Sequence, residues 1–132
     1  MIEVVLDASA AITALTGSST PEIELRARLA ETVCHAPHLI DAEIGSVLRR
    51  RLASGSITVT VAESALWATS SLVDQHYPHS ALAHAAWALR HNLSYYDALY
   101  VALAARLGIP LLTADARLAR VPGLPCAVEV IS

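Results

Sequence analysis

The chain has 132 residues, of which 55% are hydrophobic and 16% are charged, and its formal net charge is −3. This length suits a single domain with its own core, and the apolar content excludes an intrinsically disordered chain. No apolar run reaches the roughly 18 residues of a membrane span, so we expect a cytoplasmic protein that does not enter a membrane. All nine basic residues are arginine, so a nucleic acid would have to bind through a local arginine patch.

The first half of the chain alternates between short β-branched runs and longer helical patterns. Residues 2–6 form an apolar run typical of a buried strand, and an Ala-rich helix is expected over residues 8–15. Further elements are expected as a helix over 21–30, a strand over 33–36 and a helix that begins at Pro37 and ends at Gly55. This order indicates strands connected by helices.

The second half continues the same alternation. Thr60 and Glu63 have the spacing of a capping box and predict the start of a helix, which is followed by a loop at 74–78. The remaining elements are expected as a helix over 79–91, a helix from Ser94 to Gly108, a strand over 109–113, a short helix to Ala119 and a strand over 127–131. The alternation of strands and helices predicts an α/β fold with three layers (α/β/α). The middle layer is expected to be a parallel sheet of four to five strands.

Four carboxylates lie at positions that could contribute to a functional site in such a fold. Asp7 follows the first strand and Asp115 follows the penultimate one, and ligands of open parallel sheets bind beyond these carboxyl ends. Asp97 lies near the start of a helix, and Glu43 lies inside a helix beside an apolar stripe. Taken singly, Asp7, Asp97 and Asp115 also fit helix caps. A carboxylate at position 43 needs a partner or a function, because burial of an unpaired charge is unfavourable.

A shared site for these acids would be unfavourable through mutual repulsion unless a cation lay among them. Oxygen ligands with few histidines nearby favour Mg²⁺, or alternatively Mn²⁺, over zinc. Such an ion can activate water and stabilise charge that develops on a phosphodiester. The set of carboxylates therefore points to metal-dependent phosphodiester chemistry.

The sequence around these acids resembles the PIN-domain nucleases, in particular the VapC-type toxins of bacterial type II toxin–antitoxin systems. The resemblance rests on the segments VVLDASA, DAEIGSVLRR, YYDALYVALA and LLTADARL, which carry Asp7, Glu43, Asp97 and Asp115 in the family's order. It covers nearly the whole chain and implies a single PIN domain over residues 1–132. It also implies that the four acids are the catalytic residues and the ligands of Mg²⁺ or Mn²⁺.

The same resemblance implies an activity, supporting residues and partners. The activity is that of a Mg²⁺-dependent endoribonuclease, a toxin that cleaves cellular RNA and is neutralised by a cognate VapB-type antitoxin. Ser9 and Thr113 match the hydroxyl positions that support the acidic cluster in the family. The family resemblance and the surplus of apolar side chains together predict a homodimer.

Other polar and aromatic side chains have two interpretations each. The run Arg49, Arg50 and Arg51 fits either compensation of a helix dipole or contact with RNA phosphates, and Arg90 is a further candidate contact. The histidine pairs at 35 and 38 and at 76 and 79 lie on or beside predicted loops and lack a third zinc ligand. Solvated or core-edge positions are therefore favoured over a zinc site. The aromatic side chains expected in the core or at an interface are Trp67, Trp87, Tyr96 and Tyr100.

Two other functions remain open at this point. A haloacid-dehalogenase-like phosphatase also places an Asp after its first strand, but it needs a second Asp two residues later, where this chain has Ser9. A catalytically inert PIN-like binding module is the other alternative, and the presence of all four acids argues against it.

Overall fold

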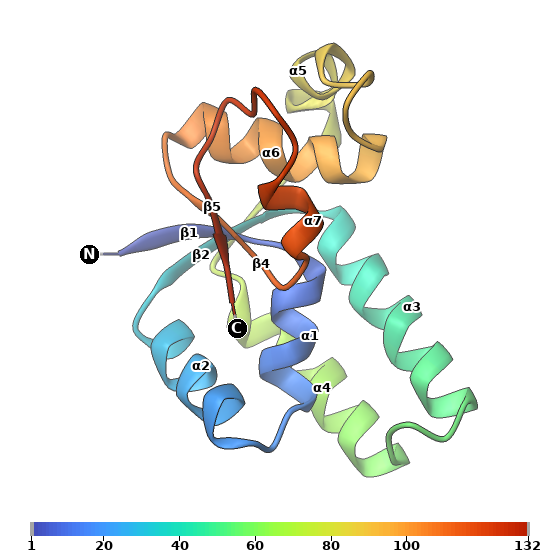
Figure 1. The fold of residues 1–132 in the computed structure, drawn as a ribbon. Coiled ribbons are helices and arrows are strands. Elements are labelled where there is room, and N and C mark those ends of the chain that lie inside the picture. The colour runs from blue at the N-terminus through green and yellow to red at the C-terminus, as the bar shows by residue number, and fades with distance from the viewer. Residues whose placement is uncertain (1, 132) are drawn as a thin grey trace.

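The computed structural model describes residues 2–131 and contains a five-stranded sheet in which every neighbouring pair of strands is parallel (Figure 1). The strands are β1 (Glu3–Leu6), β2 (Val33–Pro37), β3 (Gln75–Tyr77), β4 (Leu111–Thr113) and β5 (Val128–Val130). The α-helices are α1 (Ala8–Thr16), α2 (Thr20–Ala30), α3 (Leu39–Ala53), α4 (Val59–Leu72), α5 (Ala83–Ala88), α6 (Tyr95–Leu107) and α7 (Ala116–Ala119). A 3₁₀ turn, η1 (His79–Ala81), precedes α5. The predicted α/β class and parallel sheet are confirmed.

The order of the strands creates a switch point beside β1. The sheet runs β3-β2-β1-β4-β5, so the chain builds outward from β1 in one direction and then returns to add β4 on the other side. Val5 pairs with Leu111 and Leu6 with Leu112, which aligns the carboxyl ends of β1 and β4. The residues that follow these two strands therefore lie next to each other at the carboxyl ends of the strands, where open α/β folds bind ligands.

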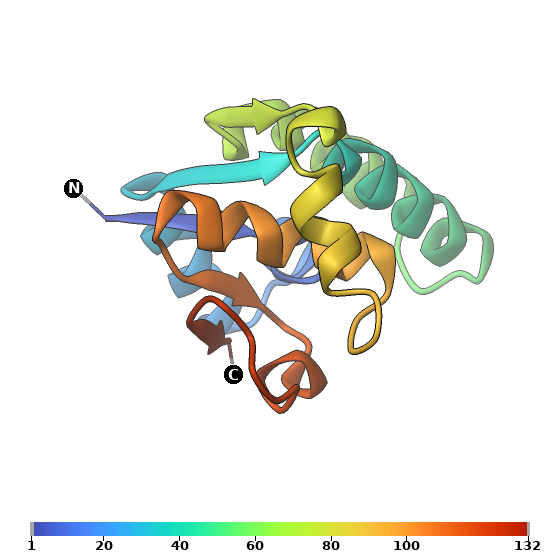
Figure 2. The same cartoon turned by 90° about the horizontal axis from the view of Figure 1, so that it is seen from above.

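Helices cover both faces of the sheet and complete the three layers. Helix α6 packs on β1, β2 and β4 with α5 beside it, while α1, α2 and α4 lie on the opposite face (Figures 1 and 2). Every residue from Ala98 to Ala104 of α6 is buried, because small alanines let this helix lie close to the strands. Gly108 ends the helix with φ of +66°, a left-handed conformation that suits glycine.

Both cysteines lie in or against the core. Cys34 is fully buried in β2, Cys126 is partly buried against the core, and both are free thiols. Among the helices of residues 2–131, none combines the length and the apolar content of a membrane span.

Three expectations about local structure were wrong. The loop expected at 74–78 contains β3, a short polar edge strand without the apolar alternation that marks a strand. The helix expected to begin at Thr60 begins earlier, because the side chain of Thr58 caps it by accepting a hydrogen bond from Val61 N. The single helix expected over 79–91 is η1 followed by the short α5. Tight turns from Arg90 N to Trp87 O and from Asn92 N to Leu89 O follow α5.

Smaller differences concern the start of α3. Pro37 closes β2 instead of opening the helix, and α3 begins at Leu39. The predicted start of a helix at Ser94 is confirmed, since the Ser94 hydroxyl caps α6 by accepting a hydrogen bond of 3.1 Å from Asp97 N.

Candidate functional site

Asp7 lies at the carboxyl end of β1 and caps the first turn of α1. Its Oδ1 accepts hydrogen bonds from Ala10 N at 2.9 Å and from Ser9 Oγ at 2.7 Å, and the Thr113 hydroxyl donates to Oδ2. The side chain is buried, with 8% of the residue exposed. Burial raises the pKa of Asp7, the hydrogen bonds from Thr113, Ala10 and Ser9 oppose that rise, and the charge of Asp97 adds to it. Asp7 is thus both the N-cap of α1 and a carboxylate whose charged form is destabilised by burial.

Ser9 and Thr113 connect the ends of β1 and β4. Their hydroxyl oxygens lie 3.2 Å apart, Ala114 N donates to Ser9 Oγ at 2.9 Å, and Asp115 N donates to Thr113 Oγ1 at 3.0 Å. Thr113 is fully buried. These bonds fix the backbone that carries Asp115 relative to the side chain of Asp7. Their geometry suits the supporting role that the sequence predicts for both hydroxyls.

Glu43 projects from α3 and is held by a tyrosine of α6. The Tyr100 hydroxyl donates a hydrogen bond of 2.6 Å to Glu43 Oε1. Partial burial raises the pKa of Glu43, the bond from Tyr100 opposes that rise, and the charges of Asp7 and Asp97 add to it. Burial also raises the pKa of Tyr100 well above its usual value, so its hydroxyl remains protonated and can donate.

The last two acids lie at helix starts, with Asp97 in the first turn of α6 and Asp115 at the N-cap of α7. Partial burial raises the pKa of Asp97, and the charge of Asp115 adds to the rise. Asp115 caps α7 and pairs with Arg117, whose Nε and Nη2 lie 3.1 Å from the two carboxylate oxygens. The guanidinium of Arg117 lowers the pKa of Asp115. Asp97 interacts electrostatically with Asp7, Glu43 and Asp115.

These acids do not form a closed metal cage in this conformation. Within residues 2–131, no three His, Cys, Asp or Glu side chains converge closely enough to hold an ion by themselves. The donor chemistry nevertheless fits Mg²⁺, which keeps several water ligands and commonly takes only one or two protein carboxylates. Burial and neighbouring acids raise the pKa of Asp7, Glu43 and Asp97, and a cation among these carboxylates would relieve their repulsion. The shared metal site stays a prediction.

Comparison with known proteins decides the family. The model that describes the PIN domain matches residues 4–124. The chain belongs to the PIN domain family. It is 50% identical over 132 residues to "Ribonuclease VapC1" from Mycobacterium tuberculosis, covering 99% of both chains. It is also 42% identical over 118 residues to "Ribonuclease VapC3" from the same species, covering 89% of this chain and 86% of that one. The resemblance to VapC-type PIN domains is thereby confirmed.

Solved structures support the same fold. VapBC2 from Rickettsia felis, crystallised with a DNA fragment from its promoter, has a chain that superposes with a TM-score of 0.71 at 18% identity and full coverage of both chains. PAE2754 from Pyrobaculum aerophilum gives a TM-score of 0.65 at 25% identity, covering 96% of this chain and 89% of that one. The PIN-like three-layer architecture is confirmed, and neither the phosphatase nor the inert module is favoured.

The arginines of this PIN domain that were candidates for RNA contact lie in different surroundings. Arg50 lines a hollow together with Glu43, whereas Arg49 lines a separate apolar hollow between α3 and α4. Arg51 Nη1 lies 3.5 Å from Thr16 Oγ1. Arg90 lies 5.0 Å from the ring centroid of Trp87 and donates to Trp87 O. Of the four, Arg50 is the one that shares a hollow with a candidate catalytic acid, and RNA contact stays a prediction for all of them.

The aromatic side chains divide into one core residue and three surface residues. Tyr100 is buried as expected, but the expectation of a core position is wrong for Trp67, Trp87 and Tyr96, which are 80%, 60% and 57% exposed. Their burial at an interface stays a prediction. Sequence reasoning did not assign a site role to Tyr100 or Arg117. The available signal was proximity, because each lies within three residues of a candidate acid, but their partners depend on the tertiary fold.

The four histidines of the two sequence pairs contact other residues of the fold. His35 lies in β2, as the strand predicted over residues 33–36 implies, and its ring nitrogens contact Tyr77 Oη at 2.8 Å and Glu3 Oε1 at 2.7 Å. The rings of His38 and His76 stack with centroids 5.4 Å apart. His79 Nε2 accepts a hydrogen bond from the backbone of α3.

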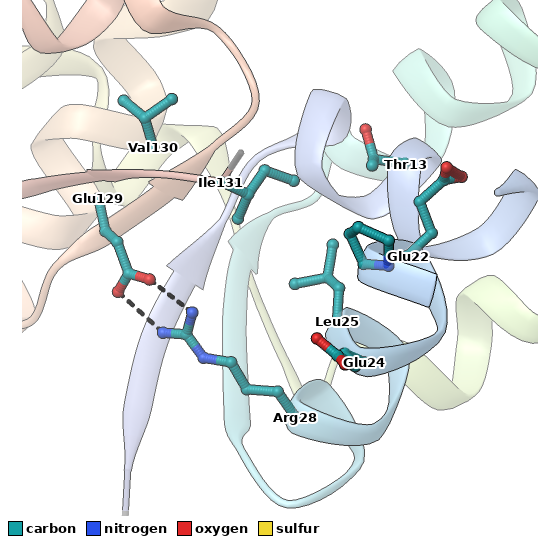
Figure 3. Close-up of a pocket in the computed structure, with 9 residues that line it drawn as sticks. Thr13, Glu22, Glu24, Leu25, Arg28, Glu129, Val130 and Ile131 are labelled. Atoms are coloured by element: carbon teal, nitrogen blue, oxygen red, sulfur yellow. Dashed lines mark hydrogen bonds and ion pairs between the residues drawn. The ribbon is translucent and has the colours of Figure 1, made fainter. Parts of the chain in front are cut away.

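A third hollow lies away from the acids, between α2 and β5 (Figure 3). Its volume is about 270 Å³, and Arg28 crosses it to pair with Glu129 through two hydrogen bonds. None of the four candidate acids lines this hollow. It therefore provides a region in which substitutions can be made without touching the candidate site.

Proposed function

We propose that this PIN domain is a Mg²⁺-dependent endoribonuclease that cleaves cellular RNA as the toxin of a type II toxin–antitoxin system. The observation that supports the proposal is that burial and neighbouring acids raise the pKa of Asp7, Glu43 and Asp97, while Asp115 follows β4, the strand that pairs with β1. The relatives named ribonuclease, at 50% and 42% identity, support the same activity.

In this proposal the four acids hold Mg²⁺, and Mn²⁺ is the alternative ion. When bound, Mg²⁺ supplies an activated water and neutralises charge on the scissile phosphodiester. Ser9, Thr113 and the α1 backbone hold Asp7 in one orientation, and Tyr100 holds Glu43. The site is preorganised because these donors are part of the folded protein before any substrate arrives.

We further propose a VapB-type antitoxin as the partner of this chain. The complex VapBC2 from Rickettsia felis supports such an assembly, and this chain exposes apolar surface that a partner could cover. An apolar hollow of about 240 Å³ between α3 and α4 includes Leu48, Leu52 and Leu66. An antitoxin arginine placed among the four acids would replace Mg²⁺ as their counter-charge, so excess Mg²⁺ would weaken the complex. Homodimerisation is part of the same proposal and is tested by sedimentation.

The activity is tested with purified chain and total RNA. We expect cleavage with Mg²⁺, no cleavage with EDTA, and recovery when Mg²⁺ is added back. Asp97→Asn should abolish cleavage, whereas Asp41→Asn should not, because Asp41 is an exposed acid that contacts His76 at 3.2 Å. Cleavage that survives EDTA or Asp97→Asn would contradict the proposal.

A further inference from the structure

A hollow of about 320 Å³ adjoins the candidate catalytic site between α3 and the start of α6. Its wall includes Leu39, Glu43, Ser46, Val47, Arg50 and Tyr96. Glu43 belongs to both the hollow and the acidic cluster, and Tyr96 precedes Asp97 in the chain. The hollow therefore begins where the reacting phosphodiester would lie, and its volume falls at the low end of the range of small-ligand sites.

The side chains around this hollow offer two kinds of contact to a nucleotide. Arg50 and Ser46 are exposed, and within residues 2–131 the 2.9 Å bond from Arg50 Nη1 to Ser46 Oγ is the polar contact that the guanidinium makes. A guanidinium has five N–H donors, so most of them remain free for a phosphate. Arg50 also supplies positive charge close to a cluster of acids that would otherwise repel RNA.

Tyr96 supplies the second kind of contact. It is 57% exposed, and within residues 2–131 its hydroxyl forms no hydrogen bond. Exposed aromatic rings beside a cationic side chain are the usual platform for single-stranded bases, and stacking contributes about 1–3 kcal/mol per base. The apolar side chains of Leu39 and Val47 line the same hollow and suit the face of a base better than a charged group.

We propose that this hollow binds one nucleotide of single-stranded RNA next to the cleaved phosphodiester, with the base against Tyr96 and a phosphate on Arg50. The inference rests on the proposed ribonuclease function and adds a subsite that selects and positions the substrate. Tyr96 and Arg50 act here in binding, so they govern KM more than the chemical step.

The test compares Tyr96→Ala and Tyr96→Phe with Tyr95→Ala in the full chain. Tyr95 is the neighbouring exposed tyrosine, but it lines a different hollow with Ala83, His84 and Trp87. Wild-type chain is first used to find a cleaved sequence in total RNA with Mg²⁺, and an oligonucleotide of that sequence is the substrate. We expect Tyr96→Ala to raise KM about tenfold with little change in kcat, and Tyr96→Phe and Tyr95→Ala to match wild type.

Binding without cleavage gives an independent readout. Fluorescence anisotropy of the same RNA on Asp97→Asn should weaken about tenfold when Tyr96→Ala is added, and adding Arg50→Gln should weaken binding and reduce its salt dependence. Equal KM values for Tyr96→Ala and Tyr95→Ala would overturn the subsite, as would a Tyr96→Phe variant as defective as Tyr96→Ala. A Tyr96→Ala variant that dissociates in sedimentation while its KM is unchanged would assign the hollow to a contact between copies. Wild-type chain without any RNA cleavage would instead refute the proposed function itself.

Discussion

The Tyr100 hydroxyl on α6 donates a hydrogen bond of 2.6 Å to Glu43 Oε1 on α3. These residues are separated by 57 positions in the chain, and α6 packs directly on the central strands. Because Tyr100 is almost fully buried, its position is fixed by the core. The hydrogen bond from Tyr100 therefore holds the Glu43 carboxylate in a fixed position relative to the core.

Replacing Tyr100 with Phe removes this donor without removing the ring. The bond opposes the rise in the pKa of Glu43, so its loss raises that pKa further and leaves more Glu43 protonated at a given pH. We expect the acid limb of the pH–activity profile to move to higher pH, with activity partly recovered in alkaline buffer. An unchanged profile would show that Glu43 does not act as a charged group.

Thr113→Val tests the hydroxyl network at the ends of β1 and β4. The substitution keeps the shape of a fully buried side chain but removes the donor to Asp7 Oδ2 and the acceptor of Asp115 N. We expect a loss of about 1–3 kcal/mol in the free energy of unfolding. Cleavage should fall about 10- to 100-fold, as for other residues that orient metal ligands. Urea denaturation and steady-state kinetics measure the two effects, and full activity would refute the supporting role.

Asp7→Asn should distinguish two opposing effects of Asp7 on stability, the destabilisation from burying its charge and the stabilisation from capping α1. Asn is also a good N-cap, and Thr113 and Ser9 can exchange donor and acceptor roles around it. Burial raises the pKa of Asp7 above its unfolded value, so the stability that Asp7 contributes is full below the unfolded pKa of about 4 and is lost as pH rises through the folded pKa.

The metal-free Asp7→Asn variant should therefore melt at or above the wild-type temperature at pH 7, and this difference should vanish in acid. Added Mg²⁺ should stabilise wild type but not the variant, because a ligand that binds only the folded state raises its stability. Calorimetry with and without EDTA measures both effects. A variant that melts clearly below wild type at pH 7 would mean that capping is the main role of Asp7.

Glu129→Gln provides a control far from the acids. Arg28 lowers the pKa of Glu129, and both side chains remain substantially exposed, at 40% and 44% (Figure 3). The pair should contribute less than about 1 kcal/mol, and this contribution should fade as pH falls through the lowered pKa of Glu129. RNA cleavage should be unchanged. A large loss of cleavage would mean that the hollow between α2 and β5 takes part in function.

The sequence predicted the carboxyl ends of the central strands β1 and β4 better than it predicted the edge strand β3. Asp7 and Asp115 each follow a strand of buried aliphatic residues, and parallel strands bring their carboxyl ends together, so local patterns were sufficient to place both acids. Strand β3 was missed because its residues, Gln75 to Tyr77, lie at the edge of the sheet and lack apolar alternation.

Other features depend on packing that a single sequence does not encode locally. Thr58 and Thr60 are both capable caps, and in the structure Thr58 is the residue that caps α4. The contact from Tyr100 to Glu43 joins distant segments, and the exposure of Tyr96 depends on which face of α6 meets the sheet. The acids could be predicted from the sequence, but their partners required the fold.

The most direct test of the account is a Mn²⁺ titration of the metal-free chain, with free ion measured by electron paramagnetic resonance. We predict saturable binding to wild type, competition by Mg²⁺, loss of at least about tenfold in affinity for Asp7→Asn and Asp97→Asn, and no loss for the surface variant Asp41→Asn. Absence of saturable binding, or equal affinity for wild type and Asp97→Asn, would contradict a shared metal site among these acids.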